Sequence, residues 1–70
     1  MIMSSDSKLS ARERFLKIYA NLPINVREEI IYVVLPKKQP ITWNVAYLEV
    51  KNNTSLGEDI LKKLEELKII

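Results

Sequence analysis

Glu49 and Lys51 are the residues whose types and spacing come closest to catalytic chemistry. They stand two positions apart near the end of an apolar run that predicts a β-strand. Because side chains alternate along a strand, both would point to the same face. The carboxylate could bind a metal ion there, and the ammonium group could steady an attacking water molecule. This pair is therefore the candidate catalytic constellation of the chain.

The triplet Glu49-Val50-Lys51 resembles the E-x-K strand of metal-dependent restriction-like nucleases. The predicted order of helix, hairpin and helix is also similar to the start of that fold, and the resemblance implies a metal-dependent or degenerate nuclease. That family has an acidic residue at the start of the hairpin, where this chain has Pro36-Lys37-Lys38-Gln39-Pro40. The alternative is a solvated, charged strand end. Because the acidic residue at the hairpin is missing, we predict no metal site and no cofactor.

The other residue types needed for catalysis are missing. The chain contains no histidine and no cysteine, which removes the commonest general base, thiolate nucleophiles and disulfides. Its serines have no base to activate them. Gly57 stands alone, so there is no glycine-rich phosphate loop. We therefore predict a protein that is not an enzyme and has no catalytic residues.

Lys37, Lys38 and Lys51 are candidate nucleic-acid contacts. With Trp43 or Tyr47 as stacking platforms they could bind single strands by charge neutralisation and base stacking. The alternative is that loop lysines protect a hairpin tip from pairing with other strands, and that Trp43 packs in the core. Eleven basic and nine acidic residues leave a net charge of only +2, which does not demand a polyanionic partner.

Helices are predicted at both ends of the chain. Ser10 to Glu13 form a capping box for a helix that continues to Asn21 and is ended by Pro23. A second helix begins at Thr54 or Ser55 and runs to the chain end. Its apolar seam recurs at helical spacing and consists of Leu56, Ile60, Leu64 and Leu67. Residues 24–29 are compatible with a short helical turn or an extended chain.

A β-hairpin is predicted between these helices. Residues 30–35 are almost all β-branched or aromatic, and the connection 36–40 has the length of a hairpin loop. The second strand is expected from Ile41 to about Asn52. Both of its faces would be apolar, which requires cover on both sides. One face would carry Trp43, Val45 and Tyr47, and the other Ala46, Leu48 and Val50.

Seventy residues allow a single α+β domain of αββα order, residues 8–70, after a disordered tail at residues 1–7. A chain of this size is marginally stable alone, and two helices cover only one face of a hairpin. We therefore predict a homodimer, formed by edge pairing into a four-stranded sheet or by stacking of sheet faces. The expected interface residues are Trp43, Val45, Tyr47, Leu48, Leu67, Ile69 and Ile70.

The leading functional hypothesis is a small non-enzymatic interaction module, an adaptor or regulatory subunit with an unidentified protein partner. A nucleic-acid-binding accessory protein is the alternative, and a nuclease is the third. The N-terminus lacks the pattern of a signal peptide, and no apolar run approaches the roughly 20 residues that span a bilayer. We therefore expect a cytoplasmic protein without membrane contact. Its bias towards Ile, Leu, Lys and Glu resembles that of heat-adapted organisms.

Overall fold

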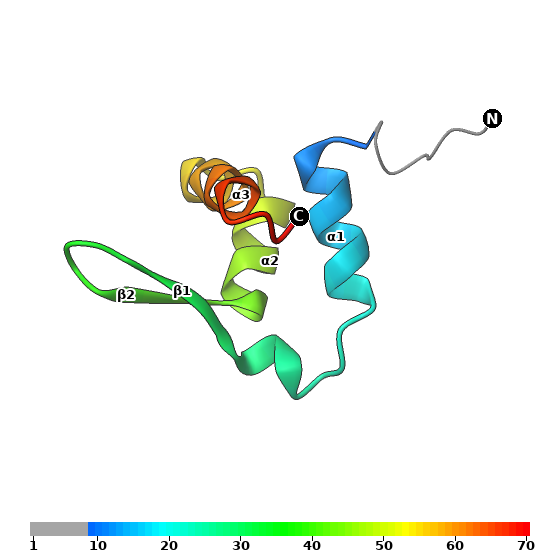
Figure 1. The fold of residues 1–70 in the computed structure, drawn as a ribbon, viewed down its shortest axis with the longest axis horizontal. Coiled ribbons are helices and arrows are strands. Elements are labelled where there is room, and N and C mark those ends of the chain that lie inside the picture. The colour runs from blue at the N-terminus through cyan, green and yellow to red at the C-terminus, as the bar shows by residue number, and fades with distance from the viewer. Residues whose placement is uncertain (1–8) are drawn as a thin grey trace.

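The computed structural model describes residues 9–70, and Figure 1 shows its arrangement of helices around a projecting hairpin. The predicted α+β fold, with an antiparallel hairpin between helices, is confirmed, whereas a third helix was not predicted. The predicted tail, residues 1–7, lies outside the described residues. The elements in order are α1 (Ala11–Ala20), the 3-10 helix η2 (Val26–Glu28), β1 (Ile30–Val34), β2 (Gln39–Thr42), α2 (Trp43–Lys51) and α3 (Ser55–Glu66).

The predicted capping box begins α1. The Ser10 hydroxyl accepts a hydrogen bond from the Glu13 backbone N–H at 3.1 Å, and the Glu13 carboxylate accepts one from the Ser10 N–H at 3.1 Å. Both bonds satisfy amides that have no partner within the helix. The chain leaves α1 just before Pro23, as predicted, and η2 shows that residues 26–28 form a short helical turn.

The hairpin strands pair in an antiparallel register. Tyr32 lies opposite Ile41, Val33 opposite Pro40, and Val34 opposite Gln39. An irregularity between Ile30 and Tyr32 interrupts this pairing near the helices. The tip of the hairpin points away from the helical part of the molecule (Figure 1).

The predicted second strand, Ile41 to about Asn52, is wrong beyond Thr42. The Thr42 hydroxyl accepts a hydrogen bond from the Val45 N–H at 3.1 Å and caps α2. Ala46 and Val50, four residues apart, then lie on one helix face and are buried. The apolar run fits a period of two as well as a period of 3.6, so the cap and the packing of α2 decide its conformation.

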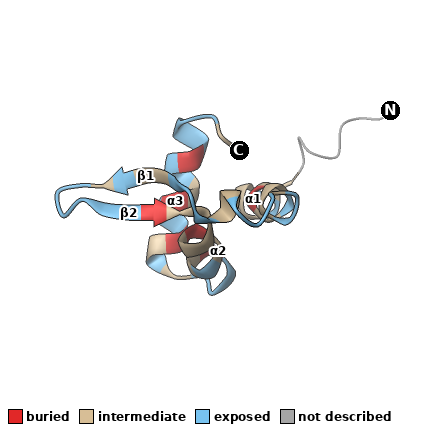
Figure 2. Ribbon diagram, turned by 90° about the horizontal axis from the view of Figure 1, so that it is seen from below, coloured by how far each residue is buried: buried red, intermediate tan, exposed pale blue. Residues whose placement is uncertain are grey.

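The buried core joins all parts of the fold except β1 and η2. It consists of six apolar side chains, Phe15, Ile41, Ala46, Val50, Ile60 and Leu64. Figure 2 shows these buried segments where α2 and α3 meet the base of the hairpin. Among residues 9–70, no helix is long and apolar enough to cross a bilayer.

Stacked aromatic rings join α1 to α2. The centroids of Phe15 and Trp43 are 6.0 Å apart, and those of Tyr19 and Tyr47 are 4.3 Å apart. The Tyr19 hydroxyl donates a hydrogen bond to the Asn44 side-chain oxygen at 2.6 Å. Trp43 and Tyr47, which we expected on one face of a strand, therefore pack against α1 inside the monomer, and the argument for dimerisation from an uncovered strand face no longer applies to them.

Candidate nucleic-acid interface

The pair α2 and α3 forms a helix-turn-helix. The helices are joined by three residues, 52–54. In Figure 1 α3 is seen nearly end-on while α2 runs across the view, and in Figure 2 the two exchange these roles. The helices therefore cross steeply, as they do in the motif that places its second helix in the major groove of DNA.

Hydrogen bonds around Thr54 fix the turn. Its hydroxyl accepts from the Gly57 N–H at 2.9 Å and donates to the Glu49 carboxylate at 2.6 Å. Its backbone N–H donates to the Glu49 carbonyl oxygen at 3.2 Å. Asn53 adopts a left-handed conformation with φ of 56°, which Asn tolerates better than most residues. The cap of α3 therefore also ties α3 to the last turn of α2.

Gly57 allows α3 to approach α2 closely. A Cβ atom at this position would overlap the Glu49 carbonyl oxygen and would lie 2.7 Å from the Glu49 carbonyl carbon. Both are backbone atoms, which cannot move aside without shifting α2. Any larger residue would therefore push the two helices apart.

The outer face of α3 is polar and carries charges of both signs. Gly57, Ile60 and Leu64 are buried on the inner face. The exposed side chains are Ser55, Glu58, Asp59, Lys62, Lys63, Glu65 and Glu66. The carboxylates outnumber the lysines, and Lys63 forms a 3.8 Å ion pair with Glu66. This face can offer both donors and acceptors to base edges, but it attracts phosphates only weakly.

The hairpin borders α3 and carries exposed cations at its tip. Lys37 and Lys38 are both exposed in the loop between the strands. A groove of about 300 Å³ separates β1 from α3 and is lined by Tyr32, Val33, Val34, Leu35, Leu56, Asp59 and Lys63. Burial raises the pKa of the Tyr32 phenol, and the nearby Asp59 carboxylate raises it further.

The third predicted lysine, Lys51, lies elsewhere, at the end of α2 beside the turn. Its ammonium nitrogen lies 5.7 Å from the centre of the Tyr47 ring. Arg12 of α1 donates a 3.4 Å hydrogen bond to the Lys51 carbonyl oxygen, so a second cation adjoins the turn. The structure thus places the three predicted lysines in two groups, at the hairpin tip and at the turn.

The predicted stacking platforms are occupied by other side chains. Trp43 packs against Phe15, and Tyr47 lies between Tyr19 and the Lys51 ammonium group. Arg27 covers Tyr19 with its guanidinium carbon 4.4 Å from the ring centre. These rings hold α1 on α2, and each ring that we expected to stack on a base already has another aromatic ring stacked against it.

Glu49 and Lys51 do not form the strand-based pair that the sequence predicted. On a helix, positions two apart point in directions about 200° from each other. The Glu49 carboxylate instead accepts the hydrogen bond from Thr54. Within residues 9–70, no group of three or more Asp, Glu, His or Cys residues could hold a metal ion. The geometric basis of the nuclease hypothesis is therefore lost.

The residues predicted to form an interface fall into two sets. Trp43, Val45, Tyr47, Ile69 and Ile70 are partly buried against the core, whereas Leu48 and Leu67 are 55% and 47% exposed.

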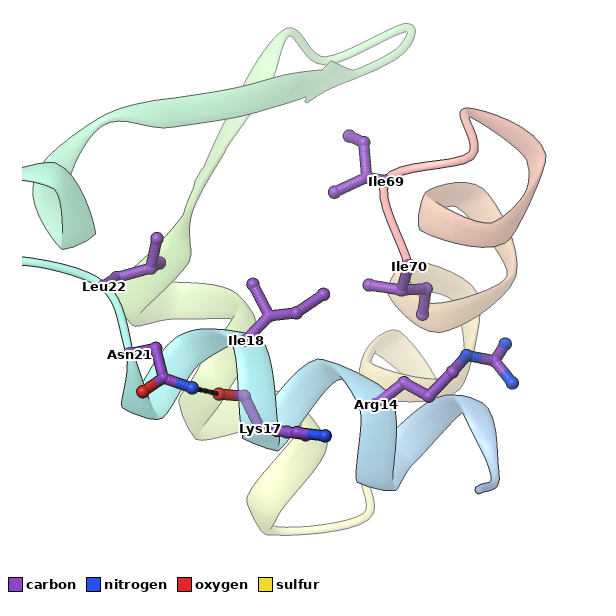
Figure 3. A pocket seen from close by; sticks show the side chains of 7 residues that line it. All are labelled: Arg14, Lys17, Ile18, Asn21, Leu22, Ile69 and Ile70. Carbon is purple, nitrogen blue, oxygen red and sulfur yellow. Dashed lines mark hydrogen bonds between the residues drawn. The ribbon is translucent and has the colours of Figure 1, made fainter. Parts of the chain in front are cut away.

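Ile69 and Ile70, the last of the predicted interface residues, border a pocket of about 410 Å³ beside Ile18 and Leu22 of α1 and the following turn (Figure 3). Arg14 at its edge is paired with Glu65 at 2.9 Å. Whether any of the predicted residues joins two copies stays a prediction.

The helix-turn-helix is the feature that reasoning from the sequence missed. Thr42 before Trp43, with Ala46 and Val50 following at helical spacing, was the available signal. Comparison of the chain with protein-family models, with curated proteins and with solved structures gave no match.

Proposed function

We propose that this protein binds double-stranded DNA through α2 and α3, with α3 entering the major groove. The steep, tightly fixed crossing of α2 and α3 is the observation that carries this proposal. A recognition helix must be presented at a fixed angle, because base contacts require atoms to be placed within hydrogen-bonding distance. Gly57 and Thr54 together supply that fixed angle.

The two groups of cations would contact the phosphate backbone. Lys51 and Arg12 flank the turn that leads into α3, and Lys37 and Lys38 extend from the hairpin beside it. Phosphate contacts of this kind give affinity and position but no sequence preference. The hairpin would reach the backbone beyond the groove that α3 occupies.

The outer face of α3 would contact the bases. Ser55, Glu58 and Lys62 recur at intervals of three and four and are all exposed. A hydroxyl can pair with any base edge, a carboxylate accepts from cytosine N4, and a lysine donates to guanine. The carboxylates repel phosphates, so we expect weak binding to arbitrary DNA and a selective preference for particular bases.

The test measures fluorescence anisotropy of labelled duplex DNA against protein at several salt concentrations. Each phosphate contact contributes about 0.9 to the slope of log affinity against log salt. Lys37→Gln or Lys38→Gln should therefore lower this slope by about 0.9 each. Lys17→Gln on the pocket side of α1 removes the same charge and should leave the slope unchanged. An equal loss in all three variants would contradict the assigned contacts.

A variant in which one carboxylate of α3 is neutralised tests the orientation of this helix on DNA. Glu58→Gln removes a repulsive charge from the proposed groove-facing surface, so affinity for duplexes of random sequence should rise several-fold. Glu28→Gln in η2 makes the same change away from α3 and serves as the matched control. No binding by the wild type at low salt, or an equal rise in both variants, would overturn the proposal.

A non-enzymatic interaction module that self-associates is the second candidate function. It is favoured by apolar side chains that remain exposed on the hairpin, where Val33 is 45% and Leu35 is 72% exposed. Solvent-exposed apolar groups close together are typical of association surfaces. This candidate is compatible with DNA binding, since many helix-turn-helix proteins bind DNA as dimers.

A further inference from the structure

The outer edge of β1 is open. The sheet has only two strands, so β1 pairs with β2 alone and no strand of residues 9–70 pairs with its other edge. An edge strand presents backbone N–H and C=O groups that can pair with another strand. Charged side chains, proline and short length are the usual means of preventing such pairing.

The two strands differ in this protection. Pro40 lies within β2 and removes a backbone donor, and Lys37 and Lys38 precede this strand directly. By contrast, residues 30–35 contain no charge and no proline. The opposite partner of Pro40 is Val33. Because prolines in sheets occupy positions whose N–H points away from the partner strand, the Val33 N–H is expected to point outward as well.

We propose that β1 pairs with β1 of a second copy, antiparallel about a two-fold axis, to form a four-stranded sheet. Because β1 itself carries no charged side chain, two copies can meet along it without repulsion. The exposed Ile30, Val33 and Leu35 side chains would then gain apolar neighbours across the axis. This proposal does not depend on DNA binding.

Sedimentation velocity without DNA tests the proposal. One added strand buries less than the roughly 800 Å² per partner of a standard interface, so the protein is sedimented over a series of concentrations from about 10 to about 100 µM. At the upper end of this series the wild type should sediment as a dimer of the 8.2 kDa chain. Val33→Lys should sediment as a monomer, because it places like charges near each other across the axis.

Ile24→Lys is the matched control. Ile24 is 77% exposed in the turn before η2, so it receives the same substitution away from the edge and should remain dimeric. A monomeric wild type would overturn the proposal. A dimeric, folded Val33→Lys variant would overturn it too, because association would then use another surface.

A cysteine variant gives an answer even where Val33→Lys fails to fold. The chain has no cysteine, so a single substitution creates a unique thiol. Antiparallel pairing near Val33 brings the two thiols of Val33→Cys close enough for a disulfide, which mild oxidation should form in most of the protein. Ile24→Cys should remain largely uncrosslinked. Equal crosslinking of the two variants would refute edge pairing.

Discussion

Thr54 makes hydrogen bonds with three backbone and side-chain groups at once, which explains why this residue, and not Ser55, is the N-cap of α3. Its hydroxyl caps Gly57 and also donates to Glu49. Thr54→Ala should lower the free energy of unfolding by about 1–2 kcal/mol, because it leaves the Gly57 amide without its acceptor. Ser55→Ala, next to it and exposed, should change stability by less than about 0.5 kcal/mol. Urea denaturation of both variants measures this difference, and equal losses would contradict the assigned cap.

Gly57 gives a second prediction at the residue scale. Alanine is favoured over glycine in a helix by about 1 kcal/mol, so an unhindered replacement would stabilise α3. Here the added Cβ would meet the Glu49 backbone, and the overlap should cost about 1–3 kcal/mol. Gly57→Ala should therefore be destabilised and should bind DNA more weakly. The difference between Lys62→Ala and Lys62→Gly, at an exposed position of the same helix, measures the alanine-over-glycine propensity effect alone. A stabilised Gly57→Ala variant would show that the helices can separate without loss.

At the scale of an element, the burial of the side chains of residues 48 and 50 distinguishes the helix α2 from the strand that the sequence predicted. Leu48 and Val50 would share a face in a strand, whereas on α2 Leu48 is 55% exposed and Val50 is buried. Val50→Ala should cost about 1–3 kcal/mol, since a buried side chain is shortened. Leu48→Ala should change stability by less than about 0.5 kcal/mol. Thermal unfolding followed by circular dichroism measures both, and similar losses would contradict the helix.

The whole molecule should unfold as one unit, because the buried side chains of α1, β2, α2 and α3 form a single cluster. Phe15 of α1 packs against Trp43 of α2, the only tryptophan. The fluorescence of Trp43 therefore reports the contact between α1 and α2, whereas circular dichroism reports the content of all helices. The two urea transitions should coincide, as two-state unfolding requires. Phe15→Ala should lower the free energy of unfolding measured by either probe by about 3–5 kcal/mol, a large share of a small domain's stability. Separate transitions would show that α1 unfolds independently.

Local signals in the sequence determined several elements. The Ser10 capping box, Pro23, the β-branched and aromatic run at residues 30–34 and the seam of α3 each specify their structure through neighbours a few residues away. Such short-range interactions are visible in the sequence because the partners lie within one turn or one strand. The α+β fold class and the two outer helices followed from them.

Only the tertiary structure decided the conformation of residues 43–51 and, with it, the candidate site. This segment is apolar at nearly every position, so both helical and strand periods fit it. Packing of Ala46 and Val50 in the core, and of Gly57 against the Glu49 backbone, favours the helix. These contacts join residues that are distant in the chain or meet only across the turn, and burial of apolar surface outweighs the strand propensity of Trp, Val and Tyr.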